Sequence, residues 1–377
     1  MRNKVRRRLK EIYRLKEDML PAGYDFVIVA RASAADATYA ELDKITDVFA
    51  AKIIGFGIKK NDHVALWGYN CANWFVTYLS IIKAGAVAVL LNYSLPVKDL
   101  ADLMELTDAK FIFYGNNRET SKDVDAAVKL AELSKLSKDK MFNFSGEAFD
   151  FKTYLNDSID TSAVKAITEA DNPRRDAIII FTTGTTALPK AVLLSQYGVI
   201  NDGIGYGDKY KDARGESICN TLPMFHSFGL MVVTLYLHDA KTVYLHELIK
   251  PEEIVKVVDK YHTPDMSGVG AVYTALVEHP DFDIKVIPSV RICLIGGSVS
   301  TPAFLMRLEE KFTHATFLNG YGQTEASPAL SMSSPTDPIE KRATSVGSLL
   351  EGGEIKIWTK EKGFMSTGEV GEVVARG

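Results

Sequence analysis

Short apolar runs alternate with longer segments of helical spacing along most of this chain. Each run holds four or five residues, many of them β-branched or aromatic, which is typical of a buried strand. Strands that alternate with helices predict parallel sheets covered by helices, an α/β fold. The predicted strands are residues 26–29, 63–67, 87–91, 111–114, 177–181, 242–245 and 292–295, and the predicted helices are residues 39–54, 74–84, 96–106, 124–136, 251–260 and 302–311.

The pattern changes at two places along the chain. Residues 136–175 are polar with few long apolar runs, which predicts a link between two α/β halves. From residue 336 onward, short apolar stretches alternate with Gly-rich turns, which predicts a small β-barrel or sheet. The predicted parts are a basic helix and lead-in at 1–34, a first α/β subdomain at 35–170, a second at 171–335, and a partial β-barrel at 336–377.

A Thr-rich loop follows the predicted strand at 177–181. It runs from Thr182 to Lys190 and combines hydroxyls, backbone N–H groups and one cation, which together suit a polyphosphate. It does not match the Walker A loop, because Pro189 precedes the lysine where that motif has Gly, and Ala191 follows it where the motif has Ser or Thr. The loop alone is equally compatible with an ordinary turn.

A second candidate segment, YGQTE, spans Tyr321 to Glu325. It places a hydroxyl on Thr324 beside the carboxylate of Glu325, a pair suited to phosphate and Mg²⁺. Taken by itself, a Tyr between glycines is more typical of turn packing. Together with the Thr-rich loop, the segment indicates an enzyme that handles ATP.

Eight blocks, taken in order, resemble the adenylate-forming superfamily: acyl-CoA synthetases, adenylation domains of nonribosomal peptide synthetases, and luciferases. The resemblance spans about residues 35–377 and is closest to the large amino-terminal domain of AMP-dependent acyl-CoA synthetases. The blocks are TYAEL at 38–42, AGAVAVLLN at 84–92, TTGTTALPKA at 182–191, LPMFHSFG at 222–229, IGGS at 295–298, NGYGQTE at 319–325, SVG at 345–347 and GEVGEVVARG at 368–377.

This resemblance implies a fold and an activity. The implied fold has two doubly wound parallel-sheet subdomains and a small distorted β-barrel, with the active site where they meet. The implied reaction joins a carboxylic acid to ATP, giving acyl-AMP, which a thiol then converts to acyl-CoA. ATP, Mg²⁺ and coenzyme A are therefore the expected cofactors and co-substrates, and a small carboxylic acid is the expected partner.

In the family, the barrel continues and a mobile carboxy-terminal domain with a catalytic lysine follows. The sequence given has neither, so we expect the 377-residue chain alone to form acyl-adenylate poorly and acyl-CoA hardly at all. Two other functions remain open. One is adenylation of an aryl or amino acid for a carrier-protein thiol, and the other is nucleotide or acyl binding without turnover.

The resemblance assigns roles residue by residue. The Thr-rich loop takes the β- and γ-phosphates, with Lys190 supplying the charge. Thr324 contacts the α-phosphate, Glu325 ligates Mg²⁺, and Tyr321 stacks on adenine. The catalytic residues are then Thr185, Lys190, His226, Thr324 and Glu325, and the cofactor-binding residues are Thr182, Thr183, Gly184, Thr186, Gly296, Gly297, Ser298, Asn319, Gly320, Tyr321 and Gly322.

The block around His226 bears on the substrate. Its place resembles the aromatic or His gate beside the substrate carboxylate in acyl- and aryl-CoA synthetases, although a single His is more often structural. Amino-acid-activating relatives carry an Asp in this region, whereas Met224, Phe225 and Phe228 offer no anion for an ammonium group. A plain carboxylic acid is therefore expected, a fatty acid first and an aryl acid second.

Two alanines depart from the family pattern. Ala187 and Ala191 stand where glycine is usual in the phosphate loop. A Cβ at a position with positive φ costs about 1 kcal/mol or more. Either this loop avoids that conformation, or closure on the nucleotide is impaired.

Composition narrows the setting. The net charge is −4 and charges of both signs are interspersed, which argues against a nucleic-acid partner. Three widely spaced cysteines indicate neither a disulfide framework nor a zinc site, so a reducing cytoplasm is expected. No run of 18 apolar residues occurs in the chain.

The first sixteen residues carry eight Lys or Arg side chains among apolar ones. A basic amphipathic helix of this kind could lie on an anionic membrane surface, which would suit a fatty substrate. The alternative, which we favour, is a solvated helix that packs its apolar stripe on the body of the protein. The segment lacks the apolar core of a secretory signal.

Overall fold

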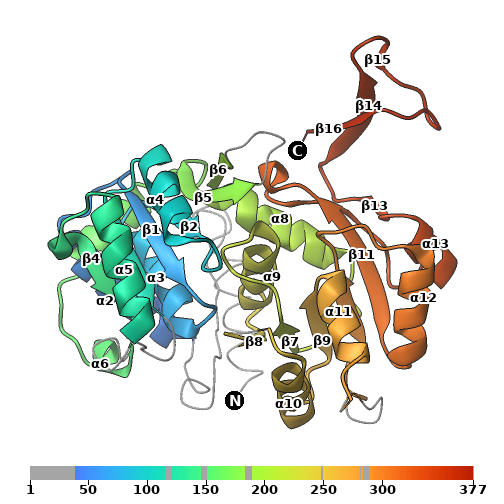
Figure 1. Cartoon of the computed structure of the whole chain (residues 1–377), viewed down its shortest axis with the longest axis horizontal. Coiled ribbons are helices and arrows are strands. Elements are labelled where there is room, and N and C mark those ends of the chain that lie inside the picture. The colour runs from blue at the N-terminus through green and yellow to red at the C-terminus, as the bar shows by residue number, and fades with distance from the viewer. Residues whose placement is uncertain are drawn as a thin grey trace.

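The computed structural model describes residues 39–115, 121–145, 151–182, 189–247, 249–280, 282 and 288–376. Two sheets with their helices lie side by side, and a small third sheet projects from the body (Figure 1). The predicted α/β fold is confirmed. The basic segment 1–34, the predicted strand 26–29, and Thr183, Gly184, Thr185, Thr186 and Ala187 of the phosphate loop lie outside the described residues.

The first sheet has six strands in the order β4-β3-β1-β2-β5-β6. Its strands are parallel except at the edge, where β6 runs antiparallel to β5. Strands β2 and β3 are buried along their whole length, as expected for a sheet covered on both faces. The strands are β1 (His63–Gly68), β2 (Val87–Leu91), β3 (Phe111–Gly115), β4 (Met141–Asn143), β5 (Asp176–Thr182) and β6 (Lys190–Ser195).

Helices cover this sheet through apolar stripes. In α2, the buried residues Leu42, Ile45, Phe49 and Ile53 recur at helical spacing, while the charged residues Asp43 and Lys44 between them are exposed. The covering elements are α2 (Tyr39–Gly55), α3 (Ala72–Lys83), α4 (Val97–Leu106), α5 (Ser121–Leu133), α6 (Phe151–Leu155) and α7 (Ser162–Glu169), with a 3₁₀ turn, η1, at Lys138–Lys140.

The second sheet has seven strands in the order β13-β12-β11-β10-β9-β7-β8. Strands β11, β10, β9, β7 and β8 are parallel, and β12 and β13 add an antiparallel edge. The strands are β7 (Ser217–Asn220), β8 (Thr242–Leu245), β9 (Asp265–Gly268), β10 (Ile292–Ile295), β11 (Thr316–Gly322), β12 (Ala329–Met332) and β13 (Ser348–Leu349), and the helices beside them are α10 (Pro251–Tyr261), α11 (Gly270–Val277), α12 (Pro302–Lys311) and α13 (Ile339–Thr344).

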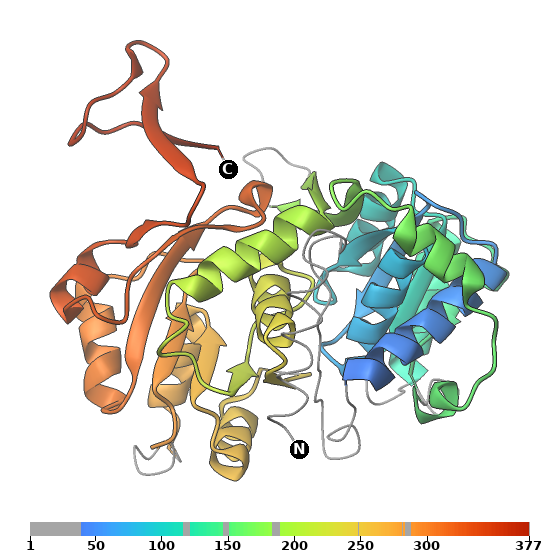
Figure 2. The same ribbon diagram turned by 180° about the vertical axis from the view of Figure 1, so that it is seen from behind.

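Two helices lie between the sheets. Helix α8 (Gln196–Asp208) crosses the middle of the molecule, and α9 (Ser227–His238) lies beside it (Figures 1 and 2). Nearly every residue of α9 is buried, which its uniformly apolar sequence explains. Helix α8 begins directly after β6, where Ser195 caps it by accepting a hydrogen bond from the backbone N–H of Gly198 at 3.0 Å.

The predicted boundary at residues 170 and 171 does not coincide with the division between the sheets. Strands β5 and β6 lie beyond that boundary, yet β5 pairs in parallel with β2 and so completes the first sheet. The predicted link at 136–175 also supplies β4, the far edge strand of the same sheet. Pairing partners of this kind depend on long-range contacts, which local polarity does not reveal.

The last part of the chain is an open sheet of three antiparallel strands that projects away from the body (Figure 2). Its strands are β14 (Glu354–Thr359), β15 (Gly363–Phe364) and β16 (Glu372–Arg376). Short strands were predicted here, and within the described residues they do not close into a barrel.

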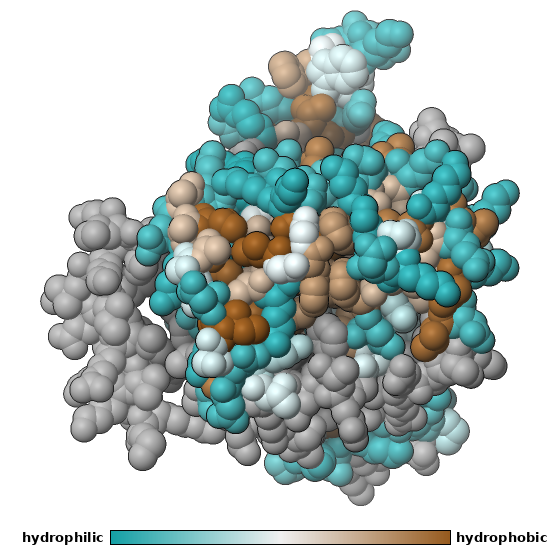
Figure 3. Space-filling model, turned by 90° about the vertical axis from the view of Figure 1, so that its left-hand side faces the viewer, coloured by the Kyte–Doolittle hydropathy of each residue, from teal (hydrophilic) through white to brown (hydrophobic). Residues whose placement is uncertain are grey.

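On the side of the first sheet, hydrophilic side chains surround a band of apolar ones (Figure 3). Large exposed apolar side chains of the described chain include Phe56, Leu106 and Leu133. Exposed Leu and Phe side chains are normal on a protein surface, because apolar atoms contribute much of its area. Among the described helices, none combines the length and the apolar character that crossing a bilayer requires.

Candidate functional site

A cavity of about 590 Å³ lies where the two sheets meet. The carboxyl ends of β2 and β5 reach it from the first sheet, and those of β10 and β11 reach it from the second, the position where α/β proteins bind ligands. Its lining includes Leu90, Asn92, Leu95, Leu103, Phe181, Thr182, Pro189, Lys190, Tyr206, Phe225, His226, Ser227, Phe228, Gly296, Gly297, Gly320, Tyr321, Gly322, Gln323, Thr324, Glu325, Pro328 and Ala329.

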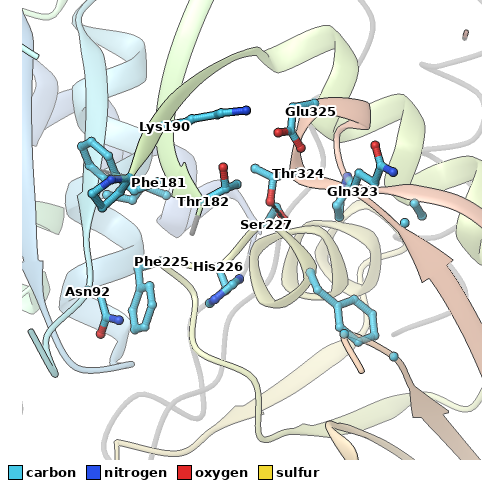
Figure 4. A pocket seen from close by; sticks show the side chains of 18 of the residues that line it. Asn92, Phe181, Thr182, Lys190, Phe225, His226, Ser227, Gln323, Thr324 and Glu325 are labelled. Carbon is cyan, nitrogen blue, oxygen red and sulfur yellow. Dashed lines mark hydrogen bonds between the residues drawn. The ribbon is translucent and has the colours of Figure 1, made fainter. Parts of the chain in front are cut away.

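Strands β5 and β6, which flank the phosphate loop, bring the hydroxyl of Thr182 and the ammonium group of Lys190 to one wall of the cavity. Thr182 ends β5 and Lys190 begins β6, and the two residues are paired across the antiparallel ladder. Lys190 is exposed and forms no ion pair with any residue that the structure describes. Its side chain extends across the opening toward Glu325 (Figure 4). The ammonium group is therefore available to an anion that enters between them.

The opposite wall is a tight turn, η3 (Thr324–Ala326). Thr324 Oγ1 lies 3.3 Å from the hydroxyl of Ser227 on α9, so the turn is joined to that helix. The carboxylate of Glu325 is exposed and faces the opening (Figure 4). Backbone bonds close the turn: Gln323 N–H donates to the carbonyl of Pro328 at 2.7 Å, and Ser327 N–H donates to that of Thr324 at 3.1 Å.

Gly322 is required by this close approach. A Cβ added there would lie 1.9 Å from the carbonyl oxygen of Pro328, far inside van der Waals contact. Any side chain would therefore push the turn away from the end of β11. The sequence assigned Gly322 to cofactor binding, and the structure adds a packing reason for glycine at this position.

The cavity could hold Mg²⁺ if the phosphate oxygens of a bound nucleotide supplied the ligands that the protein lacks. In the described part of the chain, no group of three His, Cys, Asp or Glu side chains is arranged to hold a metal. Mg²⁺ commonly uses one or two carboxylates together with substrate phosphates. Glu325 supplies one carboxylate at the cavity. It lies opposite the ammonium group of Lys190, which suits the same phosphates.

The amino terminus of α9 faces the cavity through Ser227 and Phe228. The first N–H groups of a helix lack intrahelical acceptors and carry partial positive charge, which favours an anion nearby. His226 precedes this helix, and its imidazole projects into the opening (Figure 4). Desolvation by the surrounding protein lowers the pKa of His226, so the ring is neutral at pH 7 and can donate one hydrogen bond.

The predicted adenine-side residues divide into two groups. Gly320, Tyr321 and Gly322 line the cavity, and the hydroxyl of Tyr321 accepts a hydrogen bond from Gln323 Nε2 at 2.9 Å. Asn319 does not line it, because its side chain is buried and donates to the carbonyl of Ser345 at 3.3 Å. From the turn after β10, Gly296 and Gly297 line the cavity, whereas Ser298 is exposed outside it. The ligand roles of all these residues remain predictions.

Of the two alanines in the phosphate loop, the structure describes Ala191. It lies in β6 and pairs with Phe181, and its φ is not positive. Its Cβ is therefore accommodated without backbone strain. At this position the chain avoids the positive φ that glycine would favour, which was the first of the two alternatives given above. Ala187 lies outside the described residues.

Asn70 joins the two halves of the protein and was not predicted. It follows β1 and its side chain is buried. Both the nitrogen and the oxygen of its amide form hydrogen bonds with the loop before α9. Its Nδ2 donates to the carbonyl of Leu222 at 2.8 Å, and the N–H of Met224 donates to its Oδ1 at 2.8 Å. These bonds hold the loop that presents His226. Because Asn70 and this loop are about 150 residues apart in the sequence, no local pattern indicates the contact.

We expect Asn70→Ala to lower the free energy of unfolding by about 2 kcal/mol, because the N–H of Met224 is left buried without its acceptor. Asn73→Ala serves as the control, since the side chain of Asn73 donates to the carbonyl of Phe144 within the first subdomain at 2.7 Å. Urea denaturation followed by tryptophan fluorescence measures the stability of both variants. Equal losses in the two variants would contradict a special role for Asn70.

Other cavity residues escaped prediction for simpler reasons. Asn92, Phe225 and Ser227 lie inside blocks that the sequence singled out, and their positions within those blocks were the available signal. Tyr206 lies on α8 with no motif around it, and only the packing of α8 brings it to the cavity.

Comparisons with known proteins identify the family of this chain. Residues 22–377 match the family described as AMP-binding enzyme. The acyl-CoA ligase sidI of Beauveria bassiana is 27% identical over 351 residues, which cover 90% of this chain and 60% of that protein. The mitochondrial medium-chain acyl-CoA ligase ACSF2 of Bos taurus is 24% identical, with 90% and 59% covered.

A solved structure shares the fold. The crystal structure of the long-chain-fatty-acid-CoA ligase FadD1 from Archaeoglobus fulgidus has a TM-score of 0.78 and 19% sequence identity, and the match covers 94% of this chain and 72% of that one. The chain spans about 60% of the length of the two curated relatives above. Because the family match extends over most of its residues, this chain belongs to the AMP-binding enzyme family.

Proposed function

We propose that this chain carries the adenylation site of an ATP-dependent acid–thiol ligase that forms acyl-AMP and then acyl-CoA. The observation that carries the proposal is the position of Lys190 and Glu325 on opposite walls of one cavity, with the amino terminus of α9 between the two sheets. This arrangement puts a cation, a carboxylate and helix N–H groups around a space that can hold a triphosphate.

In the first half-reaction, two anions must approach each other. Lys190 binds the β- and γ-phosphates, and Thr182 and Thr324 donate hydroxyl hydrogen bonds to phosphate oxygens. Mg²⁺, held by Glu325 and phosphate oxygens when bound, supplies charge neutralisation. The substrate carboxylate lies near the amino terminus of α9, where His226 donates a hydrogen bond without adding charge. Such fixed donors stabilise the charge that develops on the α-phosphate as pyrophosphate leaves.

The lining supports a plain carboxylic acid, and we propose a fatty acid. Glu325 is the one carboxylate among the described lining residues, and it lies on the phosphate side. A buried ammonium group on the substrate would therefore find no anion near His226. Phe225 and Phe228 provide apolar surface beside the imidazole and help to exclude water from a hydrolysable anhydride.

The test measures ATP–pyrophosphate exchange with panels of medium- and long-chain fatty acids, aryl acids and amino acids. We expect exchange that depends on a fatty acid, and a separate assay of acyl-CoA distinguishes adenylate formation from thioester formation. Exchange with an aryl or amino acid alone would favour the carrier-protein alternative. Absence of both exchange and ATP binding would contradict the proposal.

We expect Glu325→Gln to raise the Kd for ATP about tenfold when Mg²⁺ is present and to change it little without Mg²⁺. The physical reason is the loss of the one carboxylate that the lining offers to the metal. Glu325 is exposed, so folding stability should change by less than about 0.5 kcal/mol. Calorimetric titration with and without Mg²⁺ measures both constants, and equal affinity in mutant and wild type would exclude Glu325 as the ligand.

A further inference from the structure

Helix α8 connects the two walls of the cavity. It begins directly after β6, the strand that carries Lys190. Gly198, Asp202 and Tyr206 follow at intervals of four residues and therefore lie on one face of the helix. This face meets the segment from Gly320 to Ala329, which contains the turn with Thr324 and Glu325.

Two points on that face fix the carboxyl end of the turn. At Gly198, a Cβ would lie 2.6 Å from the hydroxyl of Ser327, so the turn approaches the helix as closely as a glycine allows. One helical turn later, Asp202 Oδ2 accepts a hydrogen bond from the N–H of Ala329 at 2.9 Å. Ala329 begins β12 and pairs with Gly322, so this bond also fixes the base of the turn.

Tyr206 ends the series. Its ring lines the cavity and meets Phe228 of α9 edge-on, with ring centroids 6.2 Å apart. The amino end of the turn is held separately, by Thr324 against Ser227. The turn is therefore held by α9 at its start and by α8 at its end.

Asp202 is retained in an unfavourable environment. Desolvation raises its pKa to about 8, and the N–H of Ala329 opposes that shift only in part. An apolar residue would avoid the desolvation cost but would leave the N–H of Ala329, which is itself buried, without this acceptor. The hydrogen bond to Ala329 thus explains why an Asp side chain is found on this face of the helix.

We propose that Asp202 is a positioning residue, which holds the base of the Thr324–Glu325 turn on α8 and so keeps Glu325 opposite Lys190. Asp202 is not among the residues that line the cavity. Its effect passes through the backbone of Ala329, which lies four residues beyond Glu325. The expected effect on Mg²⁺-dependent ATP binding rests on the proposed function. The role of Asp202 in holding the turn does not.

The first test is hydrogen exchange of the ligand-free protein, read by mass spectrometry. We expect Asp202→Leu to speed exchange in residues 322–332 about tenfold, the effect of losing one hydrogen bond. Peptides from α9 and β10 should keep the wild-type rate. Asp202→Asn retains an acceptor oxygen and should stay within about threefold of wild type. Asp208→Leu, at the exposed end of the same helix, is the matched control.

The second test is the ratio of ATP affinities measured with and without Mg²⁺. Asp202→Leu should lower this ratio about tenfold while Asp202→Asn restores it, a split that general destabilisation would not produce. If Asp202→Leu does not fold, Asp202→Ala, whose side chain is too short to reach Ala329, replaces it.

Three results would overturn the inference. These are unchanged exchange in residues 322–332, faster exchange in α9 and β10 as well, and faster local exchange with an unchanged Mg²⁺ ratio. A wild-type protein that binds no ATP would overturn the proposed function instead. In that case, the exchange measurement still decides whether Asp202 holds the turn.

Discussion

Lys190→Met is expected to lower the rate of ATP–pyrophosphate exchange by about 100- to 1000-fold, the range for removing one fixed electrostatic donor from a reaction of this type. Lys190 is the cation on the Thr182 wall of the cavity, and it faces Glu325. Methionine keeps most of the side-chain volume but removes the charge. One positive charge would then be missing beside the ATP phosphates when the substrate carboxylate approaches them.

Stability should be almost unchanged in this variant, because Lys190 is exposed. Lys211→Met is the matched control: Lys211 is also exposed, lies away from the cavity, and pairs only loosely with Asp208 at 4.0 Å. Exchange assays and thermal denaturation of both variants complete the experiment. A rate within threefold of wild type in Lys190→Met would remove Lys190 from the phosphate site.

Arg342→Leu is expected to lower the free energy of unfolding by about 3–5 kcal/mol, the range for breaking a buried ion pair by removing one partner. Arg342 is 6% exposed on α13 and forms a two-point ion pair with Glu309 of α12. It also donates to the carbonyls of Phe317 and Asp337, both at 2.9 Å. Leucine would leave the carboxylate and the carbonyl of Phe317 without these donors.

The effect should extend to the site, because Glu309 also accepts a hydrogen bond from the N–H of Phe317 in β11 at 2.8 Å. Strand β11 ends in Gly320, Tyr321 and Gly322 at the cavity. Arg342 therefore anchors the strand that leads to the predicted adenine side.

A surface pair provides the control for this prediction. Arg376 and Glu354 are joined at 2.9 Å, but their side chains are 80% and 57% exposed. Arg376→Leu should therefore cost less than about 1 kcal/mol. Urea denaturation compares the two variants. A double variant, Arg342→Leu with Glu309→Leu, should lose less than Arg342→Leu alone, because the uncompensated carboxylate is gone. Equal costs for Arg342→Leu and Arg376→Leu would contradict the buried-pair argument.

Much of the fold could be predicted from local patterns. Predicted strands 87–91, 242–245 and 292–295 coincide with β2, β8 and β10, and predicted helix 302–311 coincides with α12. The three strands are short apolar runs, and α12 begins with Pro302 after the capping hydroxyl of Thr301. Strand β7 and helix α8 were not predicted, because β7 is short and α8 contains four residues that disfavour helix, Gly198, Gly203, Gly205 and Gly207.

The sequence alone determined which chemistry-bearing residues the chain offers. Lys190, Thr324 and Glu325 were found from short motifs because phosphate loops and turns need particular residue types at fixed local spacing. His226 was assigned from the resemblance of its block to the adenylate-forming superfamily. The structure brings these four to one cavity, and it excludes Asn319 and Ser298 from the lining.

Only the tertiary structure decided how these residues are held. Asn70 reaches Met224 across 154 residues, and Asp202 reaches Ala329 across 127. Each contact joins a side chain to a backbone group whose position depends on the packing of two sheets around α8 and α9. Local periodicity encodes which face of an element is buried, but it contains no information about which distant backbone group that face will meet.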